Sequence, residues 1–199
     1  MTSPNAVRLK ILVVDADAER AKTVRKGLLE AGDHTVVLAA PDGGLVAIAR
    51  QHKPDVLVVG FDAPDAESID AIAQLAAESP RPVIVFADRS DDVSVRDAIQ
   101  AGVTSYVIDG LSPRRVRSVL GVALARFQSE DALRRELEEA KSTLAERKIV
   151  ERAKGILMDQ RQMSEDEAYR LLRKMAMDQG RRVSDVAQSV IAVAGVLKP

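Results

Sequence analysis

Apolar residues in the first two thirds of the chain fall into short runs that alternate with amphipathic segments. Five runs have the length and β-branched content of buried strands, and they are LKILVV (9–14), VVLAA (36–40), DVLVVGF (55–61), RPVIVFA (81–87) and TSYVID (104–109). Between and after them, apolar residues recur every three or four positions, as in helices. These segments are 19–31, 43–52, 68–78, 91–102 and one that begins near Ser112 and Pro113. The alternation predicts an α/β fold with a doubly wound five-stranded parallel sheet.

The last of these helices continues far beyond the predicted sheet, because no glycine or proline interrupts residues 122–154. Within it, apolar residues recur at intervals of four, three and four with charged residues between them. They are Leu133, Leu137, Ala140 and Leu144. Such a seam is typical either of a helix that packs on its own domain or of a coiled coil. We favour a parallel coiled coil, in which residues 128–147 form the linker of a homodimer.

Two shorter helices follow after a brief break. The first begins at Ser164, which forms an S-x-x-E capping box with Glu167, and it ends at Gly180. The second covers residues 181–197. Together with the end of the long helix they predict a small three-helix domain over 148–199. We expect its core to contain Ala153, Gly155, Leu157, Ala168, Leu172, Ala176, Val186 and Ala187.

Composition narrows the chemistry that the chain can perform. Hydrophobic residues make up 46% of it and aromatic residues only 3%, so the core must be aliphatic. There is no cysteine and there are two histidines, far apart, which excludes disulfides and argues against a zinc site. We expect no cofactor. The first residues lack the apolar run of a signal peptide, and no stretch approaches 18 apolar residues. We therefore expect a soluble, cytoplasmic protein with no membrane partner.

The net charge of −1 hides an asymmetry along the chain. Acidic side chains are in excess over residues 1–146 and basic side chains over residues 147–199. A basic C-terminal end indicates an anionic partner, although a solvated helical face produces the same pattern. The candidate contacts are Arg147, Lys148, Arg152, Lys154, Arg161, Arg170, Arg173, Lys174, Arg181 and Arg182.

The first 127 residues resemble the receiver domain of bacterial response regulators. The resemblance rests on ILVVD (11–15), PDVLVVG (54–60), RPVIVFA (81–87) and AGVTSYVID (101–109). It implies a flavodoxin-type strand order and a site at the carboxyl ends of the strands. Receivers hold Mg²⁺ there with two adjacent acids, accept a phosphoryl group on an aspartate, and stabilise it with a hydroxyl and a lysine.

This chain departs from the receiver pattern at nearly every one of those positions. Asp15 matches the first acid, but Ala16 follows it. Gly60 stands at the acceptor position, Ala87 at the hydroxyl position and Asp109 at the lysine position. We therefore expect a pseudo-receiver that serves as a scaffold, with no phosphoacceptor and no metal.

One alternative keeps phosphorylation in this domain. Asp62 lies two residues beyond Gly60 and would share its face if the strand continued. It would then be a displaced acceptor, with Asp15 and Asp17 as the remnant of a metal site. This alternative predicts a phosphorylation-dependent response regulator.

The C-terminal segment 149–191 looks like an ANTAR domain, on the residues ERAKGILM (151–158), LLRKMAM (171–177) and DVA (185–187). This resemblance implies RNA binding and transcription antitermination, with leader mRNA hairpins as the partner and no enzymatic activity. We expect no binding of duplex DNA, because the last helix has few side chains suited to base edges.

A receiver-like domain, a helical linker and an ANTAR domain together resemble the NasT and AmiR antiterminators. The stretch AGVTSYVIDGLSP (101–113) looks closest to NasT proteins. That resemblance implies control of nitrate or nitrite assimilation by a NasS-like sensor protein rather than by phosphorylation.

Gly155 lies in a helix interior, where it costs roughly 0.5–1 kcal/mol relative to alanine. It would either let another helix approach closely or clear space beside Lys154 for an RNA backbone. Lys154 is accordingly expected to contact RNA. Tyr169 is the aromatic residue of this segment that could stack on a base, and its spacing suggests that it is half buried.

Overall fold

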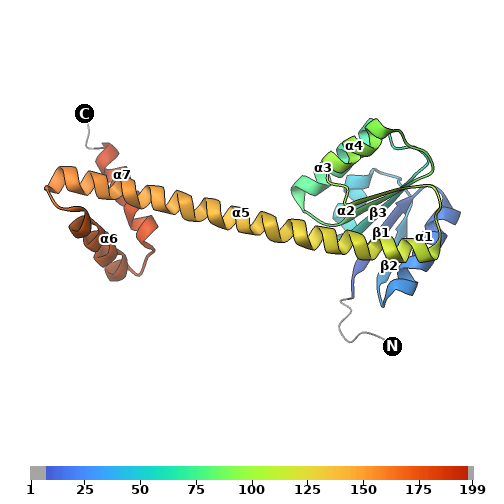
Figure 1. The fold of residues 1–199 in the computed structure, drawn as a ribbon, viewed down its shortest axis with the longest axis horizontal. Coiled ribbons are helices and arrows are strands. Elements are labelled where there is room, and N and C mark those ends of the chain that lie inside the picture. The colour runs from blue at the N-terminus through green and yellow to red at the C-terminus, as the bar shows by residue number, and fades with distance from the viewer. Residues whose placement is uncertain (1–7, 197–199) are drawn as a thin grey trace. The chain divides into compact units, whose positions relative to one another are not determined.

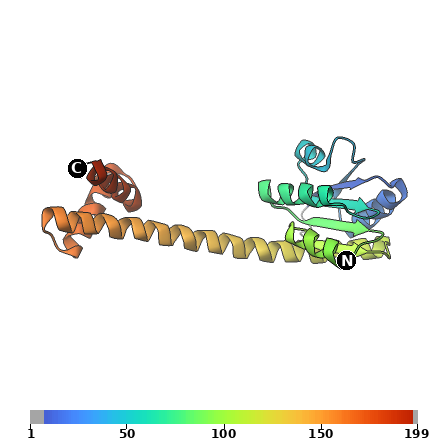
Figure 2. The same ribbon diagram turned by 90° about the horizontal axis from the view of Figure 1, so that it is seen from above.

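A computed structural model describes residues 8–196 (Figures 1 and 2). The chain divides into two compact units, one up to Asp131 and one from Ala132 onward. The division falls inside one continuous helix, α5 (Pro113–Arg161), which contains the predicted helical linker 128–147. No helix within residues 8–196 is long and apolar enough to cross a membrane.

The first unit is built on a parallel sheet with the order β2-β1-β3-β4-β5, which confirms the predicted fold class. The strands are β1 (Lys10–Asp15), β2 (Thr35–Ala39), β3 (Val56–Phe61), β4 (Val83–Ala87) and β5 (Ser105–Ile108). The register pairs Val14 with Val59 and Asp15 with Gly60. The carboxyl ends of β1, β3 and β4 therefore meet at one edge of the sheet.

Helices cover both faces of this sheet because its strands are apolar on both sides. The helices besides α5 are α1 (Ala18–Ala31), α2 (Leu45–His52), α3 (Ala66–Glu78) and α4 (Asp92–Gln100). On one face, α1 and the start of α5 pack with Val24, Leu28 and Leu120 against Val13 and Val58. On the other face, α2, α3 and α4 close a second aliphatic layer (Figure 1).

The second unit joins the end of α5 to α6 (Glu165–Gln179) and α7 (Val183–Val196), as Figure 2 shows. Ser164 and Glu167 form the predicted capping box, and Gly180 ends α6 in the left-handed conformation. One buried cluster holds the unit together. It contains Ala153, Leu157, Ala168, Leu172, Ala176, Val186 and Ala187. Four of these seven residues are alanines, so the three helices can approach closely.

The apolar seam on α5 is exposed to solvent. Leu133, Leu137 and Leu144 each expose more than half of their surface. The interpretation that this stretch packs on its own domain is therefore wrong for these leucines. The coiled-coil homodimer stays a prediction.

Candidate functional site

The position where receivers carry their acceptor aspartate has no room for a side chain in this protein. A Cβ atom added to Gly60 would lie 1.8 Å from Oδ2 of Asp15, which reaches across from the neighbouring strand. Real Cβ atoms essentially never make contacts this short, so the Asp15 carboxylate fills the space that an acceptor would need. Any residue larger than glycine would require this carboxylate to shift.

Asp15 holds this place because Arg20 of α1 binds it with two hydrogen bonds. Nε of Arg20 donates to Oδ2 of Asp15 and an Nη atom donates to Oδ1, both at 2.8 Å. The other Nη atom donates to Asp88 at 2.6 Å and to Asp62 at 3.1 Å. These carboxylates, Asp15 first, raise the pKa of the buried Arg20 above its usual value.

Arg20 was not among the residues predicted from the sequence, although its position in α1 indicates a buried cation. Arg20, Val24, Gly27 and Leu28 share one face of α1, and that face is buried against the sheet. A cation on the inward face of an amphipathic helix needs buried or converging anionic partners. Two of its three partners, Asp62 and Asp88, lie 42 and 68 residues further along the chain, so no local spacing identifies them.

The predicted remnant of a metal site is not a pair of free carboxylates. Asp15 is engaged by Arg20, while Asp17 caps α1 and accepts from the backbone N–H groups of Glu19 and Arg20. Those hydrogen bonds, chiefly that from Arg20, lower the pKa of Asp17. No cluster of acidic or histidine side chains in the described part of the chain is arranged to hold a metal ion.

Asp62, the alternative acceptor, lies beyond the end of β3 at Phe61, so it does not continue the strand face of Gly60. Its side chain is 77% exposed and forms an ion pair with Arg20. Ala87 and Asp109 occupy the positions at which receivers carry a hydroxyl and a lysine. The cation that Asp62 contacts is Arg20, which also binds the carboxylates of Asp15 and Asp88.

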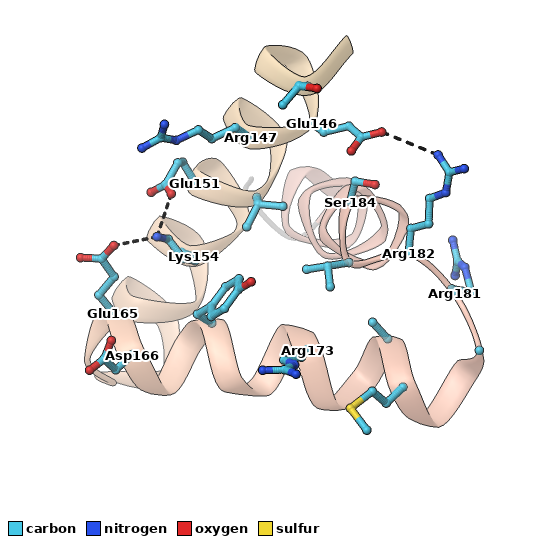
Figure 3. Close-up of a pocket in the computed structure, with 17 residues that line it drawn as sticks. Glu146, Arg147, Glu151, Lys154, Glu165, Asp166, Arg173, Arg181, Arg182 and Ser184 are labelled. Carbon is cyan, nitrogen blue, oxygen red and sulfur yellow. Dashed lines mark hydrogen bonds and ion pairs between the residues drawn. The ribbon is translucent and has the colours of Figure 1, made fainter. Parts of the chain in front are cut away.

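The second unit has a groove of about 980 Å³ between its three helices (Figure 3). Four arginines line it from different segments. Arg147 comes from α5, Arg173 from α6, and Arg181 and Arg182 from the turn before α7. The last two were predicted to begin the third helix, but α7 starts at Val183.

The remaining predicted basic contacts are exposed but lie outside this groove. They are Lys148, Arg152, Arg161, Arg170 and Lys174. Arg170, Arg173 and Lys174 were expected to act from one helix face, yet Arg173 is the member of this set that lines the groove. The fold therefore separates two groups of basic side chains that the sequence does not distinguish.

Lys154 does not present a free charge to the groove. Its Nζ atom donates to Glu151 of α5 at 2.8 Å and to Glu165 of α6 at 2.6 Å (Figure 3). Its side chain is only 9% exposed, and the two carboxylates, Glu151 first, raise its pKa. Lys154 thus joins α5 to α6 at an acidic end of the groove that also contains Asp166, and its predicted contact with RNA stays a prediction.

Tyr169 agrees with expectation, whereas Gly155 does not. Tyr169 is 46% exposed and lines the groove, so it is half buried as its spacing suggested. Nothing lies within 4 Å of a Cβ atom built on Gly155, and Gly155 is not part of the buried cluster. Its assignment to the core and the idea that another helix approaches it are therefore wrong. The second idea, space for an RNA backbone, stays a prediction.

Both parts of the chain are similar to known proteins. The sequence model of the ANTAR domain matches residues 138–191, which include the groove arginines. Over its whole length the chain is 29% identical to the transcriptional regulatory protein PdtaR of Mycobacterium tuberculosis, and the alignment covers 99% of PdtaR. It is 27% identical over 128 residues to the DNA-binding response regulator MtrA of Mycobacterium bovis, which spans 64% of this chain and 56% of MtrA.

Solved structures support the fold of the first unit. The signal receiver domain of a modulated diguanylate cyclase from Desulfovibrio desulfuricans superposes with a TM-score of 0.53 at 21% identity, over 62% of this chain and 98% of that domain. The chemotaxis response regulator CheY4 of Vibrio cholerae superposes with a TM-score of 0.51 at 18% identity, over 59% of this chain and 99% of CheY4. The first unit thus has a receiver-like fold, and residues 138–191 of the chain match the ANTAR domain.

Proposed function

We propose that this protein regulates transcription by binding paired leader RNA in the groove of its second unit and thereby preventing formation of a terminator hairpin. The observation that carries the proposal is the arginine-lined groove inside the ANTAR match. Arg147, Arg173, Arg181 and Arg182 surround one concave surface that also exposes Tyr169. A regulator of this kind acts where transcripts are made, which in a bacterium is the cytoplasm.

The chemistry of the groove suits folded RNA. Arginine binds phosphate oxygens with two parallel N–H groups and also stacks on unpaired bases. The half-exposed ring of Tyr169 offers one further stacking surface. Paired hairpins with short terminal loops present both phosphates and unstacked bases.

The charges of the groove also orient such a ligand. Glu151, Glu165 and Asp166 gather around Lys154 at one end, whereas Arg181 and Arg182 lie at the other (Figure 3). Phosphates are repelled by carboxylates, so the RNA backbone should follow the arginine end. Arg182 is paired with Glu146 only at 3.8 Å, which leaves its guanidinium available to a phosphate.

A gel-shift titration with a double-hairpin leader RNA tests this proposal. The unphosphorylated protein should bind, and its affinity should fall steeply as salt rises. Arg173→Gln should weaken binding about tenfold and reduce the salt dependence by about one phosphate contact. Lys174→Gln is the matched control, because Lys174 is the adjacent exposed cation outside the groove. Equal effects of both substitutions would contradict the groove as the RNA site.

We further propose that the protein is a homodimer through α5. The exposed seam of Leu133, Leu137 and Leu144 supports this, because a second copy would cover it. Sedimentation velocity should give a dimer that Leu137→Lys converts to a monomer. A wild-type monomer at micromolar concentration would contradict the dimer without affecting the groove.

Control by a NasS-like sensor of nitrate or nitrite is the most specific part of the proposal, and it rests on the resemblance of residues 101–113 to NasT proteins. Such a sensor would bind the acidic edge of the first unit or α5 and withhold the protein from RNA. Affinity purification from cells grown without nitrate should recover a substrate-binding-type protein. Recovery of none would overturn this part alone.

A further inference from the structure

Three carboxylates of the first unit converge on one guanidinium group. Asp15 stands at the end of β1, Asp62 follows β3 and Asp88 follows β4, and all three accept hydrogen bonds from Arg20. The backbone holds the last two in place, because the N–H of Asp88 donates to Phe61 and that of Arg89 donates to Asp62. Three like charges this close repel one another unless a cation lies between them.

Hard divalent cations are the usual solution for such a set of carboxylate oxygens. In this protein the guanidinium of Arg20 occupies the space between them instead. No buried side-chain nitrogen or oxygen within residues 8–196 is left without a hydrogen-bond partner. No buried carboxylate oxygen is therefore left free to coordinate a metal ion. The residues present therefore do not fit the Mg²⁺ ion that the receiver fold implies.

We propose that Arg20 is a built-in replacement for the divalent cation, so that the carboxyl edge of the sheet keeps one conformation whatever the supply of Mg²⁺. Arginine suits this role because its planar group carries several donors in a fixed arrangement and stays protonated at all physiological pH values. Here three of its nitrogens serve three carboxylates at distances of 2.6 to 3.1 Å. A lysine would supply one point charge and could not serve all of them.

The proposal predicts that loss of the guanidinium opens a latent cation site. In Arg20→Ala, the carboxylates of Asp15, Asp62 and Asp88 would surround the space that the guanidinium occupies in the wild type. Asp15 would keep the hydrogen bond from the backbone N–H of Asp17 but would lose its cationic partner, and a buried charge without a counter-charge destabilises a fold strongly. A divalent cation that entered this space would restore the missing charge.

Thermal unfolding of the full chain in EDTA and in millimolar Mg²⁺ tests this prediction. The protein has two tyrosines, Tyr106 in the first unit and Tyr169 in the second, so fluorotyrosine NMR follows each unit by its own signal. The wild-type Tyr106 signal should report the same melting temperature in both buffers. In EDTA, Arg20→Ala should lower it by roughly 10 °C, and Mg²⁺ should recover a substantial part of that loss. Arg25→Ala is the matched control, because Arg25 is an exposed arginine of the same helix.

Three results would overturn the proposal. One is a rise of the wild-type melting temperature with Mg²⁺, and another is paramagnetic broadening near Asp15 when Mn²⁺ is added to the wild type. The third is a folded Arg20→Ala protein that Mg²⁺ does not stabilise. If Arg20→Ala folds in neither buffer, Arg20→Lys decides, because its single ammonium leaves carboxylate oxygens without partners. Mg²⁺ must then stabilise Arg20→Lys, and failure to do so overturns the proposal.

Discussion

Among the residues that the structure describes, each unit holds one cationic side chain that is almost entirely buried, yet the two differ in what surrounds them. Arg20 contacts three carboxylates at the carboxyl ends of three different strands, and the side chain of its main partner, Asp15, is only 1% exposed. Lys154 contacts Glu151 and Glu165, whose side chains are 53% and 65% exposed. Both cations are paired, but only the first pair is shielded from water.

The difference decides what each cation can do. An ion pair with exposed partners is screened by salt and weakens when a carboxylate is protonated or turns away. A buried pair leaves an uncompensated charge if one partner is removed, so it behaves as a permanent part of the fold. The position of a basic residue within a functional segment does not by itself show that it contacts the ligand. The burial of its carboxylate partners must also be considered.

The largest expected effect comes from restoring an acid at the acceptor position. Gly60→Asp would place a Cβ atom against the Asp15 carboxylate and disturb its pair with Arg20. The free energy of unfolding of the first unit should fall by about 3 kcal/mol or more, measured by urea denaturation at the Tyr106 signal. Gly121→Ala is the control, because nothing lies within 4 Å of its added Cβ atom. Equal stability of the two variants would contradict the close approach of Asp15 to Gly60.

The next effect separates Lys154 from the groove arginines. Lys154→Met should leave the salt dependence of RNA binding unchanged, because Glu151 and Glu165 already neutralise this charge. Arg173→Gln should reduce the slope of log affinity against log salt by about one. Gel-shift titrations over a salt series measure both slopes. A slope that falls equally in Lys154→Met would make Lys154 a direct phosphate contact.

Acid should lower the stability of the second unit through Glu165, one of the two partners of Lys154. The ion pair with Lys154 holds the pKa of Glu165 below its usual value of 4.5. A lowered pKa means that the folded state favours the carboxylate, so the contribution is present above pH 4.5 and is lost as pH falls through the folded value. The melting temperature at the Tyr169 signal should therefore drop below that pH. Glu165→Gln should flatten the profile, and an unchanged profile would show that this pair contributes nothing.

A smaller effect concerns the glycine beside Lys154. Gly155→Ala should raise the free energy of unfolding by about 0.5–1 kcal/mol, because its added methyl group meets no neighbour. If an RNA backbone approaches this point, the same substitution weakens RNA binding while it stabilises the helix. Denaturation and gel shift on one variant distinguish these effects, and unaltered RNA affinity would remove Gly155 from the RNA site.

The smallest expected effect is none at all. Acetyl phosphate should leave the intact mass of the protein unchanged, since Gly60 cannot accept a phosphoryl group and Asp62 lacks a neighbouring hydroxyl and lysine. Intact-mass spectrometry measures this directly. A gain of about 80 Da, the mass of one phosphoryl group, that disappears in Asp62→Asn would restore the phosphorylation alternative.

The local features of this fold could be read from the sequence. The alternation of β-branched runs with helical segments is a short-range signal, and it located all five strands within a few residues. The capping box of Ser164 and Glu167 depends on side chains three residues apart, so it too was predictable. The apolar face of α6 follows from the same local spacing.

The chemistry of both sites depends on contacts that local spacing cannot reveal. Arg20 meets Asp62 and Asp88, which lie 42 and 68 residues further along the chain. Lys154 meets Glu165 across the turn between two helices, and this contact joins α5 to α6. In both cases the sequence identified the charges, but only their burial and partners determined what those charges do.

The close approach of Asp15 to Gly60 also limits the evolutionary paths open to this domain. An aspartate at position 60 would meet the Asp15 carboxylate, which is paired with Arg20. Phosphorylation chemistry of the receiver type would also need a hydroxyl at the position of Ala87 and a lysine at the position of Asp109. Several coordinated substitutions would therefore be needed, because the first of them alone would displace Asp15 from its partner.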